Sequence, residues 1–176
     1  MIQTRTIPVD KKKVRLQLAG SLLFVLLGVL FVVKPFLFIR SDDPTVIRII
    51  GYICTAFFGI GVILFVQKLR DKKEGLVIDG EGVTDNSSGI AAGRVLWRDV
   101  KSIRVEQVAG QPFIMLEVKD PLSYLQQQKN PVKKRAMELN LQLYKTPVGI
   151  SARFLNIRFE QLLQLLENAF KASGNK

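Results

Sequence analysis

The side chains best suited to chemistry in this 176-residue chain are two serines in a glycine-rich loop, Ser87 and Ser88. A serine hydroxyl needs a neighbouring general base to act as a nucleophile, and histidine, the commonest base, does not occur in the chain. A Ser-His-Asp system is therefore impossible. A lysine base such as Lys145 stays open on composition, although neither serine starts the S-x-x-K spacing of serine–lysine enzymes. We expect no catalytic residue, and an unrecognised membrane enzyme is the least favoured hypothesis.

Acidic side chains and glycines gather in the same region but match no metal or phosphate site. Asp79, Glu81 and Asp85 lack the order and spacing of an EF-hand calcium loop. The glycines at 80, 82, 89 and 93 fit neither a P-loop nor a G-x-G-x-x-G motif between a strand and a helix. We interpret both sets as turn residues and expect no cofactor and no metal.

Two uncharged apolar stretches, 16–33 and 49–66, dominate the N-terminal part of the chain. As a helix each would be roughly 27 Å long, close to the ~30 Å hydrocarbon core of a bilayer. They predict a transmembrane hairpin with an external loop at 34–48. A cleaved secretory signal is the alternative for the first stretch. However, that stretch exceeds the usual apolar region of a signal peptide, and no A-x-A-like cleavage site follows.

Basic residues account for the net charge of +11 and are concentrated beside these stretches. The flanks 1–15 and 67–75 are short and basic, and such flanks stay in the cytoplasm. We therefore predict a membrane protein with both termini in the cytoplasm. The candidate lipid-headgroup contacts are Lys11, Lys12, Lys13, Arg15, Lys68, Arg70, Lys72 and Lys73. Each is worth about 1 kcal/mol beside an anionic leaflet, although such charges can also do no more than fix topology.

Small residues recur within both apolar stretches at spacings that allow close helix contact. They are Gly51, Thr55 and Gly59 in the second stretch, and Gly20 or Ser21 together with Gly28 in the first. Packing within the hairpin is the favoured interpretation, and dimerisation is the alternative. The middle of each stretch holds no ionisable residue, which argues against a proton relay or a transport pathway.

The segment 76–171 has the pattern of an α+β domain. We predict strands at 76–79, 83–84, 94–97, 100–108, 112–119, 147–151 and 154–157, with a bulge between Val100 and Ile103 and with 112–119 as a central strand. Helices are predicted at 121–128, 131–143 and 159–171. In 131–143 an apolar series with a helical period leaves Lys133 and Lys134 on another side. The final helix is amphipathic, and we expect its apolar face to pack on its own sheet rather than lie on a membrane.

Several segments of this domain resemble a pleckstrin-homology-like (PH-like) domain. They are 76–79 with 82–83, the run 95–103 with its Trp97-x-Asp99-Val100-x-x-Ile103 pattern, 113–116, 146–150 and the helix from Phe159. The whole layout is similar to a bacterial family of uncharacterised membrane-anchored proteins with two N-terminal transmembrane helices. The resemblance implies a mostly β, partly open barrel closed by the C-terminal helix. With the charge pattern of the flanks, it also implies a multi-pass protein of the bacterial cytoplasmic (inner) membrane. Eukaryotic phosphoinositide-binding PH domains carry basic residues in the first hairpin loop, but residues 79–82 are acidic here.

Within that run, we expect Trp97 to cap one end of the barrel, with Val100 and Ile103 pointing inward. Asp99 is expected to accept backbone N–H bonds at a turn.

The favoured function is a non-enzymatic interaction or scaffold module that binds a protein partner or itself at the inner face of the membrane. The alternative is recognition of anionic phospholipid by basic side chains. A second basic cluster lies on the soluble domain: Lys129, Lys133, Lys134 and Arg135. It is interpreted first as a solvated helix face, and contact with lipid or a partner is the less favoured interpretation. We expect no nucleic-acid partner, because the basic excess lies beside the apolar stretches rather than on the soluble domain.

Overall fold

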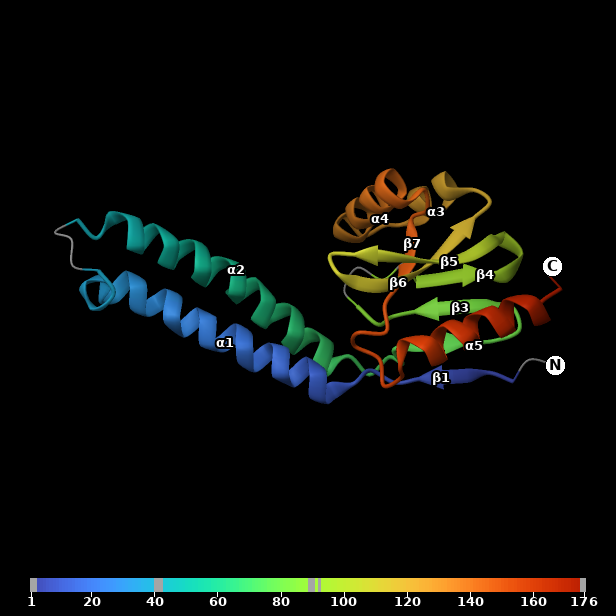
Figure 1. Ribbon diagram of the computed structural model, residues 1–176, viewed down its shortest axis with the longest axis horizontal. Helices are drawn as coiled ribbons and strands as arrows, with labels where there is room; N and C mark the ends of the chain where they lie inside the picture. Colours follow the sequence, from blue (N-terminus) through green and yellow to red (C-terminus); the bar gives the residue numbers. More distant parts are fainter. Residues whose placement is uncertain (1–2, 40–42, 89–90, 92, 175–176) are drawn as a thin grey trace. The chain divides into compact units, whose positions relative to one another are not determined.

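The protein was analysed as a computed structural model that describes residues 3–39, 43–88, 91 and 93–174. The chain divides into two compact units (Figure 1). The first is a helical hairpin, Lys11–Lys72. The second is an α+β domain formed by the segment before Lys11 together with the segment from Lys73 onward.

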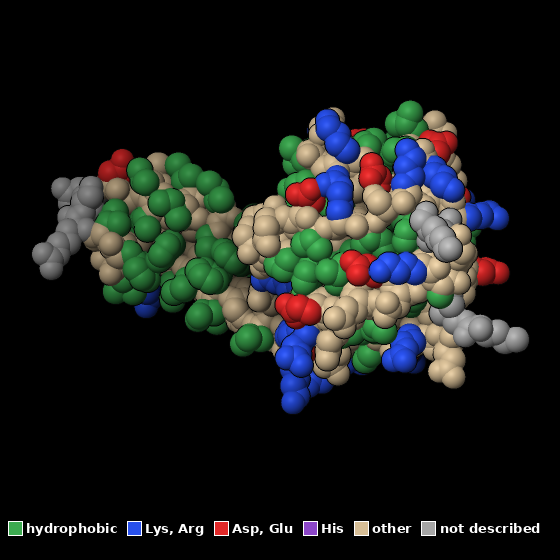
Figure 2. All heavy atoms as spheres, turned by 45° about the vertical axis from the view of Figure 1, so that its right-hand side comes forward, with side chains coloured by type: hydrophobic (Ala, Val, Ile, Leu, Met, Phe, Trp, Pro, Cys, Tyr) green, Lys and Arg blue, Asp and Glu red, His purple; other side chains and the backbone are tan. Residues whose placement is uncertain are grey.

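The hairpin consists of α1 (Lys11–Val33) and α2 (Thr45–Arg70), with the short 3-10 helix η1 (Pro35–Leu37) in the loop between them. Both helices are long and apolar enough to cross a membrane. Most of their large hydrophobic side chains are exposed, and Figure 2 shows the hairpin surface as largely hydrophobic. A helix that is apolar all round requires apolar surroundings. The expectation of two long apolar helices is confirmed, and polar residues extend α1 back to Lys11 and α2 forward to Arg70.

The two helices run antiparallel and approach most closely at two glycines. A Cβ atom placed on Gly51 would lie 2.7 Å from the carbonyl oxygen of Gly28, and one placed on Gly28 would lie 2.9 Å from that of Gly51. Nearby, the rings of Phe24 and Phe58 stack with their centroids 4.4 Å apart. The backbones therefore touch where no side chain separates them, as is common between membrane helices.

Most of the small residues predicted for this interface are confirmed: Gly51 and Thr55 on α2, and Ser21 and Gly28 on α1. A Cβ atom on Gly28 would lie 2.5 Å from the hydroxyl oxygen of Thr55, and one on Gly61 would lie 3.3 Å from that of Ser21. The prediction of Gly59 was wrong, because a Cβ atom there would meet no atom within 4 Å, and the same holds for Gly20, the alternative to Ser21. Further contacts come from Phe24, Phe31, Cys54, Phe58 and Gly61.

The α+β domain contains two antiparallel sheets. The first has the order β1 (Arg5–Ile7), β2 (Leu76–Ile78), β3 (Gly82–Asp85) and β4 (Gly93–Leu96), and the second has the order β5 (Val100–Val108), β6 (Gln111–Val118) and β7 (Val148–Ile150). The short 3-10 helix η2 (Trp97–Asp99) connects them. The central place of β6 and the bulge after Val100 are confirmed. The strand predicted at 154–157 is not formed, since Leu155 makes only an isolated bridge with Val9.

The N-terminal segment supplies the edge strand of the first sheet, a role that the sequence did not predict. Arg5 pairs with Ile78 and Ile7 pairs with Leu76. Just beyond this strand, the backbone N–H of Asp10 donates to the carbonyl oxygen of Phe154 at 2.8 Å. Three residues are too few to display the alternation that identifies a strand. The segments on either side of the hairpin thus fold together in one domain.

The core of the domain lies between the two sheets and α5 (Phe159–Ala172). Its fully buried side chains include Leu76, Val83, Trp97, Ile114, Leu116, Ile150, Leu155, Leu162 and Leu166. Leu162 and Leu166 show that the apolar face of α5 packs on its own domain, as predicted. Trp97 and Val100 are both buried, and Ile103 packs against the core. The coarse α+β architecture is therefore confirmed, whereas closure into a barrel stays a prediction.

Helices α3 (Pro121–Gln127) and α4 (Pro131–Tyr144) connect β6 to β7 and lie together beside the second sheet (Figure 1). Each starts with a capping side chain followed by proline. The Asn130 side chain accepts hydrogen bonds from the backbone N–H groups of Val132 and Lys133, which stabilises the start of α4. At its end, Lys145 adopts the left-handed conformation, with φ of 61°. Two independent caps therefore set the limits of α4.

The close approach at Gly51 predicts that Gly51→Ala destabilises the hairpin by about 1–3 kcal/mol, the usual cost of overpacking. The new methyl group would lie 2.7 Å from a backbone oxygen that cannot move away without separating the helices. The matched control is Gly59→Ala, which changes the same residue type in the same helix but faces open space. Thermal unfolding of the detergent-solubilised protein should show a lower transition for Gly51→Ala only. Equal transitions for the two variants would contradict this packing.

Candidate functional site

The residues considered for catalysis do not form a site. Ser87 is buried, and its backbone N–H donates to the Asp85 carboxylate at 2.8 Å. Lys145 ends α4, and no hydrogen bond joins it to either loop serine in the described part of the chain. Within the described ranges, no group of three metal-ligating side chains is placed to hold an ion.

The structure brings the juxtamembrane basic residues to one end of the hairpin. Lys11, Lys12, Lys13 and Arg15 lie in the first turns of α1, Lys68 and Arg70 lie in the last turn of α2, and Lys72 and Lys73 follow directly. Because the two helices are antiparallel, these two ends meet. Lys68 is also 3.4 Å from the Asp71 carboxylate. Contact of this cluster with lipid headgroups stays a prediction.

The second basic cluster lies where α4 begins. Lys129 precedes the helix, and Lys133, Lys134 and Arg135 lie in its first half. The Arg135 guanidinium donates to Glu138 one turn along the helix at 3.2 Å. This cluster therefore belongs to one capped and well-ordered element.

The first hairpin loop of the domain is held by a bidentate ion pair. The Arg94 guanidinium donates to both carboxylate oxygens of Asp79, at 2.7 and 2.9 Å. Asp79 also accepts the backbone N–H groups of Glu81 and Gly82, and its carbonyl oxygen accepts the indole N–H of Trp97 at 2.9 Å. The hydrogen bonds from Arg94 hold the pKa of the Asp79 carboxyl below its usual value. Asp79 is therefore more than a solvated turn residue, because it ties the loop to β4 and to the core.

A polar hollow of about 490 Å³ lies between β4 and α3. It is lined by basic and acidic groups, among them Arg94, Arg98, Lys119, Asp99 and Asp120, together with Tyr124. The Tyr124 hydroxyl donates to the Asp99 carboxylate at 2.9 Å. Asp99 therefore accepts a hydrogen bond from a side chain in place of the expected backbone N–H groups. Burial and this hydrogen bond raise the pKa of Tyr124 to about 12. The mixed charges of this hollow favour neither an anion nor a cation.

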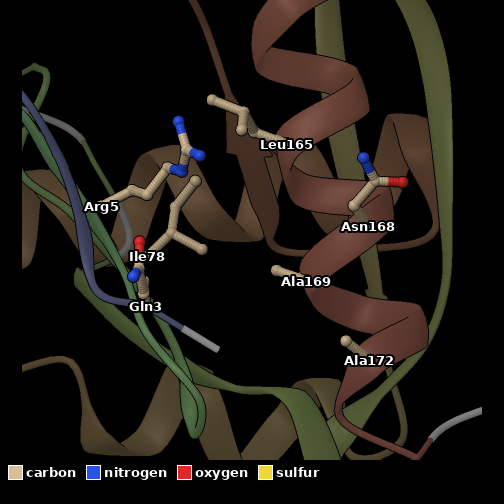
Figure 3. A pocket seen from close by; sticks show the side chains of 7 residues that line it. All are labelled: Gln3, Arg5, Ile78, Leu165, Asn168, Ala169 and Ala172. Atoms are coloured by element: carbon tan, nitrogen blue, oxygen red, sulfur yellow. The ribbon is translucent and has the colours of Figure 1, made fainter. Parts of the chain in front are cut away.

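A second hollow of about 380 Å³ runs between the first sheet and α5, and we call it the β1–α5 groove (Figure 3). Its lining consists of Gln3, Arg5, Ile78, Leu165, Asn168, Ala169 and Ala172. Ile78, Leu165 and the two alanines give it apolar walls, and Figure 3 shows Arg5 facing Leu165 across it. Arg5 is the single charged residue of the lining and is exposed. Within the described residues it makes no hydrogen bond or ion pair with another side chain.

The sequence did not predict this groove, because its outer wall is β1. Arg5 was assigned to a basic flank, and its pairing with a strand more than seventy residues away leaves no local signal. The one available indication is in α5, where small alanines interrupt the series of large apolar side chains. Small residues leave room between a helix and the sheet that it covers.

Comparisons with models of known protein families, with curated proteins and with solved structures found no match. The structure itself supports two long apolar helices followed by an α+β region.

The Asp79–Arg94 pair predicts a contribution to stability that depends on pH. A carboxyl with a lowered pKa in the folded protein stabilises it above the unfolded pKa of 3.8, and the contribution is lost as the pH falls through the folded pKa. Asp79→Asn should therefore be less stable than the wild type at pH 6, and the difference should shrink towards pH 3. Fluorescence of Trp97, the one tryptophan of the chain, reports unfolding because it is buried against this loop.

The matched control is Glu81→Gln in the same loop, because Glu81 is exposed and lies 3.7 Å from Arg94. It should show the acid dependence of the wild type. A constant difference between Asp79→Asn and the wild type from pH 6 to pH 3 would exclude this role of Asp79.

Proposed function

We propose that this chain is a non-enzymatic, membrane-anchored interaction module. Its helices α1 and α2 cross the cytoplasmic membrane of a bacterium, and its α+β domain, of the PH-like class, stands at the inner face. There the domain binds a protein partner or a second copy of the chain. Two antiparallel sheets with a C-terminal helix packed on their core support the PH-like assignment.

The pairing of β1 with β2 supports two crossings of the membrane. These strands lie immediately before α1 and shortly after α2, and they form one sheet. Strands in one sheet must lie on the same side of a bilayer, so the intervening helices must cross it an even number of times. The basic residues at this end of the hairpin favour the cytoplasmic side.

The observation that carries the binding proposal is the edge of β1 beside the β1–α5 groove. β1 is the outermost strand of its sheet in the described structure. A free strand edge accepts an extended peptide through backbone hydrogen bonds, while neighbouring pockets select its side chains. The groove supplies apolar walls and the cation Arg5, which makes no ion pair with another described residue. The preferred ligand is therefore an extended segment with apolar residues and one carboxylate.

The membrane arrangement predicts that reporter proteins fused before Met1 or after Lys176 are both active in the cytoplasm. The chain should also stay in the membrane fraction in alkaline carbonate, because two apolar helices hold it in the lipid. A reporter that is active only outside the cytoplasm, or release of the chain by carbonate, would refute this topology.

If the β1–α5 groove binds a partner, a crosslinking probe placed in the groove should capture that partner in cells. A photoreactive amino acid at Asn168, which is exposed and lines the groove, should capture one defined protein or a second copy of the chain. Arg5→Glu should reduce that product about tenfold, the factor expected for a loss of about 1.4 kcal/mol. Ala172→Trp should also reduce it by filling the groove, whereas Lys171→Trp, on an exposed neighbour outside the lining, should not.

A chain that stays an uncrosslinked monomer with the probe at Asn168 would overturn the binding proposal. Equal products from Ala172→Trp and Lys171→Trp would show that a different surface makes the contact.

A further inference from the structure

Helix α4 turns its apolar stripe away from the domain. Val132, Leu139 and Leu143 are 65%, 44% and 68% exposed, whereas Met137 of the same helix is buried. With 3.6 residues per turn, the three exposed positions lie together on the side opposite Met137. The apolar series that the sequence showed in this helix is thus directed outward rather than into the core.

This outward face does not result from loose attachment of the helix. Asn130 caps its start, and the Arg104 side chain on β5 donates to the carbonyl oxygen of Tyr144 at its end. Met137 and Leu125 of α3 are both buried. The helix is therefore fixed at both ends with its apolar stripe in the open, which is unfavourable in water unless something covers it.

The charges on the same element identify what covers the stripe. Residues 129–145 contain five basic side chains, Lys129, Lys133, Lys134, Arg135 and Lys145, and one acidic side chain, Glu138. With 3.6 residues per turn, Lys133 and Arg135 lie on either side of the apolar stripe, whereas Lys134 lies on the far side of the helix. A helix with an apolar stripe and such flanking basic side chains is suited to the interface of an anionic bilayer. There, the apolar side chains enter the headgroup region and the basic groups reach the phosphates.

We propose that α4 docks on the anionic leaflet of the membrane that anchors the chain, with Val132, Leu139 and Leu143 inserted and the surrounding basic groups on lipid headgroups. This inference rests on the membrane anchoring in the proposed function, but not on the β1–α5 groove. It assigns lipid contact to a defined helix face, separate from the surface that binds protein.

A second copy of the chain fits this face less well. A symmetric dimer through α4 would place two strongly basic helices against each other. Three aliphatic side chains also fall far short of the 20–30 residues that each side of a stable protein interface contributes. Weak insertion is sufficient for a tethered domain, because the tether keeps its effective concentration at the surface high. Residues 71–75, which join α2 to β2, span at most about 17 Å.

The test uses the full-length chain with Cys54→Ala, which removes its one cysteine. Nitroxide labels are attached singly at Leu139→Cys and, as a control, at Gln164→Cys on the exposed polar face of α5. The protein is reconstituted in nanodiscs of phosphatidylcholine alone or with 30% phosphatidylglycerol. Access of oxygen and of a water-soluble nickel complex to each label then reports its depth in the membrane.

The measured quantity is the ratio of oxygen access to nickel access at each label. In phosphatidylglycerol discs, this ratio should be at least ten times larger at residue 139 than at residue 164. Replacing Lys129, Lys133 and Arg135 by glutamine should make the label at residue 139 more accessible to nickel, as it would be in water. In a second series the label is placed at Val132→Cys, and the exposed residues Leu139 and Leu143 are both replaced by glutamine. This change should also make the label more accessible to nickel, while Trp97 fluorescence shows that the fold is retained.

A label at residue 139 that stays as accessible to nickel as the label at residue 164 in both lipids would overturn the proposal. A label shielded from both reagents would also overturn it, since that result indicates a protein contact. Release of the chain from the membrane by alkaline carbonate would instead refute the anchoring itself, which distinguishes the two failures.

Discussion

The three-residue pairing of β1 with β2 is the constraint on which the rest of the architecture depends. Arg5–Ile7 lie before the hairpin and Leu76–Ile78 lie after it, so this short ladder makes one domain from two distant segments. It also makes α1 and α2 a loop between two paired strands, because both ends of the hairpin lead into the same sheet. The same strand forms the outer wall of the β1–α5 groove. One short strand therefore both completes the first sheet and lines the groove.

Two kinds of interface coexist in this molecule and follow different physical rules. In the α+β domain, large side chains such as Trp97, Ile114 and Leu166 are removed from water, and the hydrophobic effect drives their packing. Between α1 and α2, small residues such as Gly28 and Gly51 bring the backbones together and Phe24 stacks on Phe58, while most of the large apolar side chains are exposed. Close backbone contact of this kind is common between helices in lipid, where apolar side chains gain little from facing each other.

The sequence predicted those elements whose signals are local and strong. The two long apolar helices, the central strand β6, the bulge after Val100 and the packing of α5 all follow from composition and period. The sequence did not predict β1, since three residues carry no periodicity and the partner strand is distant. Periodicity also identifies an apolar stripe without telling whether it faces the core, which is why the outward turn of α4 required the structure. The four-residue step from Gly51 correctly identified Thr55, but a second step of four led to Gly59, where a Cβ atom would meet no atom within 4 Å, because repeated steps of four drift around the helix.

The position of β1 in the chain also fixes the order of events during synthesis. This strand leaves the ribosome before either long helix, and its partner β2 emerges only after both have been made. The first sheet therefore cannot acquire its outer strand until translation has passed residue 78. Closing this long loop costs chain entropy, and the pairing of α1 with α2 reduces that cost because it brings the two ends of the hairpin together. A nascent chain whose two long helices are not yet paired is therefore expected to complete this sheet less readily.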